Sequence, residues 1–535
     1  MLTAKDLMKY GYFPLELPPP FQTIDLGDMV NKKFMNQCEN FVSRWHAKDK
    51  KNNLAESKCC NYSVPRVKHL RRIVGIPNPL YQIILCSYIE KNWKEIRKHI
   101  KKSPLSISRP ILPINRKNEY SRAFDLVKDN IKFEQELALR STEFSYILRT
   151  DISRYYHTLY THSISWALHG KNDAKKGRKD PLFYGNDLDM WVRSTRDGQT
   201  LGIPIGPDSS IIISEIVATS IDLDLKKQMK KDLHGIRIID DYLLFFKEKQ
   251  DCEAALSKLH GIFKNFELEM NPSKIKILEL PYTLEPQWKS EIRQFQFRPP
   301  REKASISNKV TIQKTDLINY FSRVNEFCRI FSEANVLKYS LKRFYKEKIL
   351  KKNIPLFESL LLKSTLVQSS CIPDVTTILL KNVGSGYKGK KERINRTISE
   401  LIRIHSKFSN DFEISWALWL AKEMDLEIEK SVYDYLSQID NPIVVLLILD
   451  LRENELIDDT INDKTWKKFL VKEQLYDDHW LLAYEALKKE WLPASNDYIE
   501  EDPFFKRLKD NDVSFYNSVS AETVTVPEPT TYESY

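Results

Sequence analysis

The sequence predicts an α+β protein, in which a mixed N-terminal half of strands and helices precedes an all-α domain. Runs of apolar and β-branched residues at 144–150 and 235–246 have the lengths and flanking turns of buried strands. From about residue 301 onward, apolar residues recur at helical spacing in segments separated by polar or proline breaks. A chain of 535 residues is long enough for about two to four domains of this kind.

The composition is that of a basic globular protein. Lys and Arg total 83 against 73 for Asp and Glu, and the net charge of +10 suits a polyanionic partner without requiring one. The seven cysteines form no CxxC pair and no Cys/His metal spacing, which fits a reducing cytosol. Neither a leader-like segment nor a run of about 18 apolar residues is present, so we expect a cytoplasmic protein without a membrane span.

The first 60 residues are expected to form an extended arm and a helical segment. Proline removes backbone donors and fixes φ, so the proline-rich stretch 11–21 cannot be a regular helix and should pack as an arm. Cations cluster at 65–79 and again at 91–102, where Trp93 and Ile96 mark one side of a helix. Clustered cations are compatible both with phosphate binding and with a solvated charged face.

The strongest chemical signal is the pair Asp240-Asp241 inside the apolar run 235–246. Two strands are expected to meet there in a hairpin whose turn carries both carboxylates. Buried neighbouring carboxylates repel each other, and a hard divalent cation such as Mg²⁺ would relieve that repulsion. A surface β-turn is the alternative, because Asp is common in turns.

A third carboxylate, Asp151, ends the apolar run 144–150. If this strand lies beside the hairpin, Asp151 converges with Asp240 and Asp241. Such a cluster suits two-metal phosphoryl transfer, in which ions about 3.5–4 Å apart clamp the attacking and leaving oxygens.

A loop rich in Gly and Pro, 198–210, lies between these two carboxylate stretches. It leads into an apolar run, 211–225, that is expected to be a helix capped by Asp208 or Ser209. Backbone without Cβ atoms can approach a base or a phosphate closely, although an ordinary loop before a helix is the simpler explanation.

Beyond residue 301 the helical pattern is broken into short segments. Helices are expected at 336–349, 356–367, 398–408, 416–424 and 442–451. Their lengths favour stacked helix pairs of the α-solenoid kind, although no clean sequence repeat is visible.

Four stretches together resemble the successive palm motifs of reverse transcriptases, in the family's order and spacing. They are DISRYY (151–156), GIPIGP (202–207), DD (240–241) and LEMNPSK (268–274). More narrowly, the chain resembles the prokaryotic antiphage reverse transcriptases of the abortive-infection type. This narrower resemblance covers nearly the whole chain and rests on GYFP (11–14), ELPP (16–19), YTHSISWALHGK (160–171), DHWLLAYE (478–485) and VSFY (513–516).

The resemblance implies a domain organisation. The arm and helical segment at 1–60 would precede a right-hand palm with reduced fingers at 61–300. An α-helical, HEAT-like or solenoid-like domain would follow at 301–517, with a flexible tail at 518–535.

The resemblance also implies roles for single residues. Asp151 and Asp240 would hold two Mg²⁺ ions, with Asp241 beside them and the Ile152 carbonyl completing one metal shell. The positions that match nucleotide contacts are Arg66, Arg71 and Arg72 for the triphosphate, Tyr156 for the sugar, Gly206 in the loop and Lys274 for the leaving pyrophosphate.

Two positions depart from the family pattern. Ile238 stands where a tyrosine usually precedes the Asp pair, and Ile205 stands where a glutamine usually precedes the second glycine of the loop. Both positions normally touch primer or template in the resembled family. The departures therefore bear on the copying of a long template and leave the metal chemistry untouched.

The implied function is that of a Mg²⁺-dependent nucleotidyltransferase, a DNA polymerase of the reverse-transcriptase type acting in antiphage defence. By resemblance it would be protein-primed, and either template-independent or guided by a non-coding RNA. Its expected partners are dNTPs, the DNA product, that RNA and further copies of the chain. Tyr532 and Tyr535 are the priming candidates, with Tyr10 and Tyr12 as the alternative, and an inert tail is equally compatible. The second hypothesis is a catalytically silent, nucleic-acid-binding scaffold protein in defence.

Overall fold

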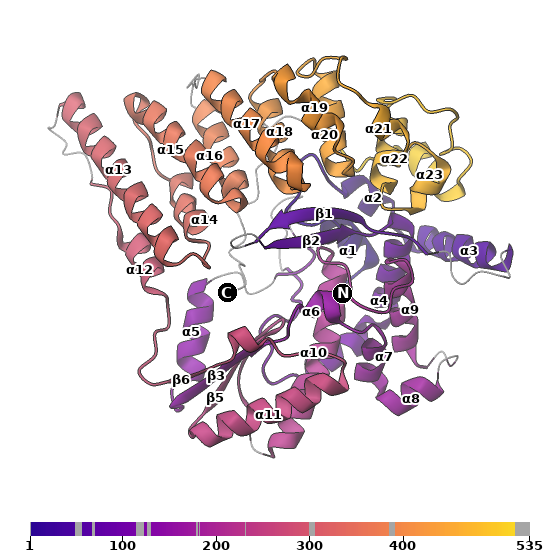
Figure 1. The fold of residues 1–535 in the computed structure, drawn as a ribbon. Coiled ribbons are helices and arrows are strands. Elements are labelled where there is room, and N and C mark those ends of the chain that lie inside the picture. Colours follow the sequence, from indigo (N-terminus) through magenta and orange to yellow (C-terminus); the bar gives the residue numbers. More distant parts are fainter. Residues whose placement is uncertain are drawn as a thin grey trace.

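The computed structural model describes residues 2–48, 56–66, 70–113, 122–125, 130–177, 180, 182–230, 232–298, 305–384 and 391–518. The expected α+β class is confirmed: a small central sheet with surrounding helices occupies the N-terminal half, and a row of helices follows (Figure 1). Within the described ranges, no helix has the length and apolar character that crossing a membrane requires.

The central sheet is antiparallel, with the strand order β4–β5–β3–β6. Its strands are β3 (Tyr146–Asp151), β4 (His234–Ile238), β5 (Asp241–Phe246) and β6 (Lys276–Glu279). The predicted hairpin is confirmed as β4 and β5, although its turn holds Asp240 and not Asp241, which is already the first residue of β5. Strand β3 lies beside β5 with Leu148 opposite Leu244. Because side chains alternate along a strand, Leu148 and Leu244 face the main core while Ile147 and Phe245 face a smaller apolar cluster on the other side.

Helices lie on both faces of this sheet: the helix Lys249–Asn265 packs on β3 and β5, and Leu137 of the helix Asn130–Arg140 belongs to the smaller cluster on the other face. The helices of the N-terminal half are α1 (Ala4–Tyr10), α2 (Ile24–Met29), α3 (Lys32–Lys48), α4 (Pro79–Ile100), α5 (Asn130–Arg140), α6 (Tyr155–Thr158), α7 (His162–His169), α8 (Lys171–Lys176), α9 (Tyr184–Ser194), α10 (Asp208–Met229), α11 (Lys249–Asn265) and α12 (Gln287–Gln294). The helix expected around Trp93 and Ile96 is α4, and both side chains are buried.

Helix α10 begins differently from the prediction. Its N-cap residue is Pro207, and no side chain caps it. The expected cap by Asp208 or Ser209 is wrong because the Asp208 carboxylate is used elsewhere. It pairs with the Arg122 guanidinium and accepts a hydrogen bond from the Ala123 amide at 3.0 Å.

The proline-rich stretch 11–21 contains no helix and packs on the rest of the chain, as predicted. Tyr12 is fully buried, and its hydroxyl donates to the Pro77 carbonyl. The Asp208 amide donates to the Gly11 carbonyl at 2.7 Å, which joins this arm to the start of α10.

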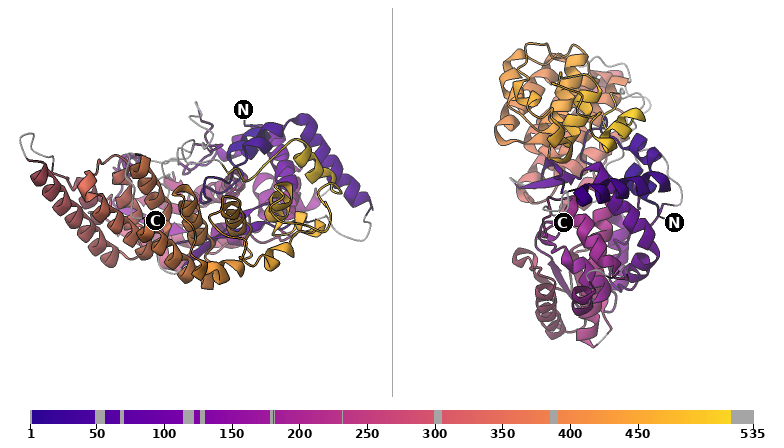
Figure 2. Two further views of the ribbon diagram at one scale, coloured as in Figure 1. Left: turned by 90° about the horizontal axis from the view of Figure 1, so that it is seen from above. Right: turned by 90° about the vertical axis from the view of Figure 1, so that its right-hand side faces the viewer.

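A second, two-stranded sheet joins the two halves of the chain. It consists of β1 (Cys60–Pro65) and β2 (Arg71–Ile76), paired antiparallel. The Tyr62 hydroxyl lies 2.6 Å from Ser415 Oγ, and Trp480 Nε1 donates to the Ile76 carbonyl at 3.2 Å. One apolar core therefore runs from the sheets into the helical domain, which lies above them as a layer (Figure 2).

The described part of 305–518 contains no strand. Its helices are α13 (Ile306–Ile330), α14 (Val336–Leu341), α15 (Ile354–Val367), α16 (Ile372–Gly384), α17 (Lys391–His405), α18 (Asp411–Glu423), α19 (Tyr433–Ser437), α20 (Pro442–Glu453), α21 (Lys464–Lys467), α22 (Trp480–Lys488) and α23 (Pro503–Asp510). Seen from above, they follow one another in chain order along a row (Figure 2). The domain boundaries and the HEAT-like repeat stay predictions.

One helix of this domain is shorter than predicted. The segment 336–349 is helical only to Leu341 and continues as a 3-10 turn over Lys342–Tyr345. Phe344 in this turn packs against Phe321 and Phe357, with ring centroids 5.5 Å and 4.8 Å away. This packing depends on helices distant in sequence and accompanies the early end of the α-helix.

Candidate active site

Three carboxylates meet at one end of the central sheet. Asp151 is the last residue of β3, Asp241 is the first residue of β5, and the two are paired directly across the strands. Asp240 lies in the turn between β4 and β5, and the Ile152 amide donates to its carbonyl at 3.3 Å. The convergence expected from the sequence is therefore present, because β3 is the neighbour of the hairpin.

Lys274 lies between two of these carboxylates. Its ammonium is 2.6 Å from Asp151 Oδ2 and 3.2 Å from Asp241 Oδ1. It belongs to a 3-10 turn, Pro272–Lys274, that follows Asn271. The Asn271 amide donates to the Asp151 carbonyl at 3.1 Å, so the turn that carries the lysine is attached to the end of β3.

The three carboxylates lie close enough together to repel one another, and their pKa values reflect this. Burial, together with Asp241 and Asp151, raises the pKa of Asp240 to about 7. Burial and Asp151 also raise the pKa of Asp241, although Lys274 opposes the shift. Burial lowers the pKa of Lys274, but Asp241 and Asp151 outweigh it and the net shift is upward. A cation is therefore favoured here because it relieves repulsion among the carboxylates.

The carboxylates fit a hard divalent cation in chemical type. Asp151 Oδ1 is buried and has no hydrogen-bond partner among the described residues. A buried oxygen without a partner is unfavourable, and carboxylate oxygens are the ligands that Mg²⁺ takes. Across the described ranges, no group of three His, Cys, Asp or Glu side chains is already arranged around a metal position. In this arrangement the Lys274 ammonium supplies the positive charge between Asp151 and Asp241.

Two of the residues predicted to contact the nucleotide interact electrostatically with the site. Partial desolvation and Arg72 lower the pKa of Arg66, while the Asp240, Asp151 and Asp241 carboxylates oppose that shift. Arg66 is therefore within electrostatic range of the carboxylates, and Arg72 acts on both Arg66 and Tyr156.

Tyr156 also lies beside the carboxylate cluster. Its hydroxyl is 3.2 Å from Ser214 Oγ, and burial is the main cause of its raised pKa. Asp240 adds to that shift and Arg72 opposes it.

Two other residues that were predicted to contact the nucleotide bind other parts of the chain instead. The Arg71 guanidinium binds Glu413 of α18 through two hydrogen bonds of 2.7 and 2.9 Å. Gly206 lies against the arm: a Cβ atom built on it would stand 2.7 Å from Pro14 Cγ, and its φ of +131° is one that glycine adopts readily. Its carbonyl accepts from Arg122 Nη2 at 2.9 Å. Arg71 therefore links β2 to the helical domain, and Gly206 allows the loop to approach the arm.

The priming candidates differ in accessibility. The Tyr12 hydroxyl is buried and hydrogen-bonded to Pro77, and Tyr10 is partly buried. Tyr532 and Tyr535 lie outside the described residues.

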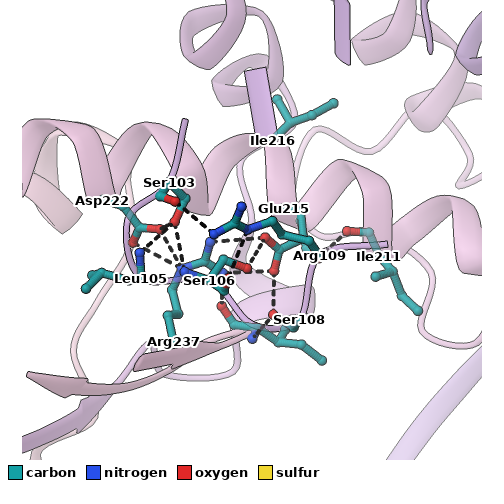
Figure 3. Close-up of polar contacts among 12 residues, drawn as sticks. Ser103, Leu105, Ser106, Ser108, Arg109, Ile211, Glu215, Ile216, Asp222 and Arg237 are labelled. Carbon is teal, nitrogen blue, oxygen red and sulfur yellow. Dashed lines mark hydrogen bonds and ion pairs between the residues drawn. The ribbon is translucent and has the colours of Figure 1, made fainter. Parts of the chain in front are cut away.

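A buried polar network that was not predicted from the sequence lies behind the carboxylate turn (Figure 3). Arg237 of β4 is fully buried and pairs with Glu215 at 2.9 Å and with Asp222 at 2.9 Å, both on α10. Ser108 Oγ donates to Glu215 Oε1 at 2.7 Å. Glu215 and Asp222 are seven residues apart and therefore lie on one face of α10, and that spacing was the available signal.

Comparison with known proteins identifies the domain that contains this site. Residues 82–325 match the family "Reverse transcriptase (RNA-dependent DNA polymerase)". None of the curated proteins searched matches the chain. The match marks this region as a reverse transcriptase domain, which is a nucleotidyltransferase of the RNA-directed DNA polymerase type, and it includes all three carboxylates and Lys274.

Solved structures of telomerases also resemble the chain, at low similarity. A telomerase from Candida albicans in complex with a TWJ fragment of telomeric RNA has 12% identity and a TM-score of 0.29, covering 66% of this chain and 67% of that one. An apo telomerase from Candida tropicalis has 11% identity and a TM-score of 0.30, covering 66% and 70%. At these TM-scores the functional argument rests on the family match and on the geometry of the site.

Proposed function

We propose, from the premise that residues 82–325 form a reverse transcriptase domain, that the chain is a Mg²⁺-dependent DNA polymerase. The observation that carries the proposal is the meeting of Asp151, Asp240 and Asp241 at one end of the central sheet. Three crowded carboxylates, one with an unpartnered buried oxygen, are unfavourable for a purely structural site and suitable for cation binding.

The residues around the cluster have complementary roles in nucleotide transfer. A hydroxyl attacks the α-phosphate of a dNTP, and pyrophosphate leaves. Bound Mg²⁺ would supply Lewis-acid stabilisation of the charge that develops on the phosphate oxygens. Asp151, Asp240 and Asp241 would hold the ions, with the Ile152 carbonyl as a further ligand.

The neighbouring side chains would handle the nucleotide itself. The carboxylates act electrostatically on Arg66, Arg72 acts on Arg66 in turn, and both cations would bind the triphosphate. The Tyr156 ring would limit the space at the sugar and select dNTPs. The Lys274 ammonium, already close to Asp151 and Asp241, would neutralise the leaving pyrophosphate.

The biological setting is a further part of the proposal. The resemblance to antiphage reverse transcriptases spans nearly the whole chain, and it supports a role in abortive infection with synthesis primed by a protein hydroxyl. Ile205 and Ile238 place apolar side chains where primer and template contacts are usual, which supports a reaction independent of a long template. A non-coding RNA and further copies of the chain are the proposed partners.

The test is dNTP incorporation by the purified chain with Mg²⁺ and without added template or primer. The matched variant is Asp240→Asn/Asp241→Asn, which keeps side-chain volume and removes both charges, and Asp316→Asn in α13 serves as a remote control. Products are separated on a denaturing gel with and without protease. Label that requires the aspartates and is lost with protease supports a protein-primed polymerase. Label that requires them but resists protease supports the polymerase and rejects self-priming.

The competing function is that of a catalytically inactive scaffold that binds nucleic acid. One observation favours it, because Lys274 already neutralises Asp151 and Asp241 as a structural ion pair would. Absence of label, repeated with co-purified or added RNA, would support this nucleic-acid-binding scaffold and reject the polymerase.

A further inference from the structure

The turn that carries Asp240 has an unusual backbone. Ile239, the residue before Asp240, has a φ of +54°. This left-handed conformation is rare for a β-branched residue, because Cβ crowds the neighbouring backbone. Such a conformation persists only where the surrounding structure holds it.

Both polar groups of Ile239 are held by buried side chains. Its amide donates to Ser108 Oγ at 2.8 Å, and its carbonyl accepts from Arg237 Nη1 at 2.8 Å. Ser108 and Arg237 are themselves bound to the same carboxylate, Glu215, which is fully buried in α10. One carboxylate therefore anchors both sides of the strained residue.

The anchoring groups leave little freedom of movement. The Arg237 guanidinium makes two hydrogen bonds to Glu215, at 2.9 and 3.1 Å, and binds Asp222 through Nε. The segment that carries Ser108 runs along β4: the Arg237 amide donates to the Leu105 carbonyl and the Ile107 amide donates to the Arg237 carbonyl. Figure 3 shows Ser106 and Ser108 directed toward Glu215 and Arg237.

We propose that Ser108, Glu215 and Arg237 are positioning residues of the active site, because they hold Ile239 in its left-handed conformation and so orient the Asp240 carboxylate. The inference rests on the proposed polymerase function and adds residues that touch neither nucleotide nor metal. Removing the clamp lets the turn relax toward a less strained backbone, and Asp240 moves with it. The chemical step then slows while nucleotide affinity stays the same.

Ser106 provides a matched control. It is buried like Ser108, lies two residues away on the same face of the segment, and donates to Glu215 Oε2 at 2.9 Å. Unlike Ser108, it accepts no hydrogen bond from Ile239. Ser106→Ala and Ser108→Ala therefore each remove one hydroxyl bond to Glu215, and only Ser108→Ala leaves the Ile239 amide without an acceptor.

The experiment compares Ser108→Ala, Ser106→Ala and Ser108→Thr in the full chain, by dNTP incorporation kinetics and by amide hydrogen exchange of the turn. We expect kcat to fall about 10- to 100-fold in Ser108→Ala with an unchanged KM for dNTP, since a small misplacement of a catalytic group has effects of this size. Ser106→Ala should stay within about twofold of the wild type, and Ser108→Thr, which keeps the hydroxyl, should recover most of the rate. Equal losses in the two alanine variants, or a loss confined to KM, would overturn the inference.

Hydrogen exchange separates this inference from the proposed function. Ser108→Ala should speed exchange of the Ile239 amide, and Ser106→Ala should leave it as in the wild type. Absence of incorporation by the wild-type chain would count against the polymerase alone. The exchange comparison would still decide the clamp, and equal exchange in both variants would reject it.

Discussion

Asp151 and Asp241 face each other across strands β3 and β5, and the ammonium of Lys274 bridges their carboxylates at 2.6 and 3.2 Å. The bridge stabilises a pair of like charges that strand pairing forces together. It also puts a cation within reach of any phosphate bound at the cluster. The ion pairs of Lys274 bear on stability, and its proposed contact with the leaving pyrophosphate bears on the rate, so the two effects can be measured separately.

Lys274→Met should lower both activity and stability. Without the ammonium, Asp151 and Asp241 repel each other, and the leaving pyrophosphate loses a neutralising group. We expect kcat to fall about 100-fold, in the range typical of a positioned general acid, and the melting temperature without Mg²⁺ to fall. Lys276→Met, at an exposed position of β6, is the control and should change neither quantity. Wild-type kcat in Lys274→Met would remove this lysine from the mechanism.

Mg²⁺ should stabilise the folded chain through Asp151. A ligand that binds only the folded state at one hundred times its dissociation constant adds about 2.7 kcal/mol to the free energy of unfolding. Thermal denaturation with increasing Mg²⁺, reversed by a chelator, measures this effect. Asp151→Asn should abolish the response, whereas Asp316→Asn in α13 should keep it. A response that survives in Asp151→Asn would place the cation elsewhere.

Arg71 and Arg72 should differ in function although they are neighbours. Arg71→Leu leaves the buried Glu413 carboxylate without its guanidinium partner, so the free energy of unfolding should fall by about 3 kcal/mol, and the KM for dNTP should stay unchanged. Arg72→Leu should raise that KM with little change in stability. Denaturant unfolding and steady-state kinetics on both variants check the contrast. A raised KM in Arg71→Leu would return this residue to the triphosphate site.

The Asp411 carboxyl should make stability depend on pH. Burial raises its pKa to about 7, against about 3.9 in an unfolded chain, so the folded protein holds this proton more tightly. The contribution of Asp411 to stability therefore falls as the pH rises from about 4 to about 7 and is constant above that range. The full difference is on the order of 4 kcal/mol, at about 1.4 kcal/mol per pKa unit.

Asp411→Asn isolates this contribution. The amide oxygen can still accept the hydrogen bond that the Ser63 amide donates to Asp411 at 3.0 Å. The unfolding free energy of the variant minus that of the wild type should increase between pH 4 and pH 7. A difference that is flat across this range would show that Asp411 titrates normally.

The tyrosine that primes synthesis can be identified by testing which Tyr→Phe variants still form DNA covalently linked to the protein. Tyr532→Phe/Tyr535→Phe should abolish protease-sensitive label and leave synthesis from an added primer intact. Tyr12→Phe should lower stability, because the Tyr12 hydroxyl is buried on the Pro77 carbonyl. Protein-linked DNA that persists in the tail variant would reject the tail, and its loss in Tyr10→Phe would identify Tyr10.

Much of the candidate site can be predicted from short stretches of the sequence. The apolar and β-branched runs on either side of Asp240-Asp241 and the apolar run ending at Asp151 predict a hairpin and a strand, because such runs and turn residues are properties of a few neighbouring positions. The α-helical character after residue 301 follows for the same reason. The early end of the helix at Leu341 could not be predicted in this way, because Phe344 packs against residues of other helices.

The sequence by itself determined which carboxylates could gather, where β3 and the β4–β5 hairpin lie, and that the chain after residue 301 is helical. Only the tertiary structure decided the partners: Arg71 binds Glu413, Gly206 makes room for Pro14, and Arg237 is buried against α10. The physical reason is that burial and charge pairing depend on residues far apart in the chain. The sequence pattern around an arginine in a basic stretch is the same whether its side chain binds a triphosphate or a buried glutamate. Only the residues that pack around the side chain distinguish the two cases.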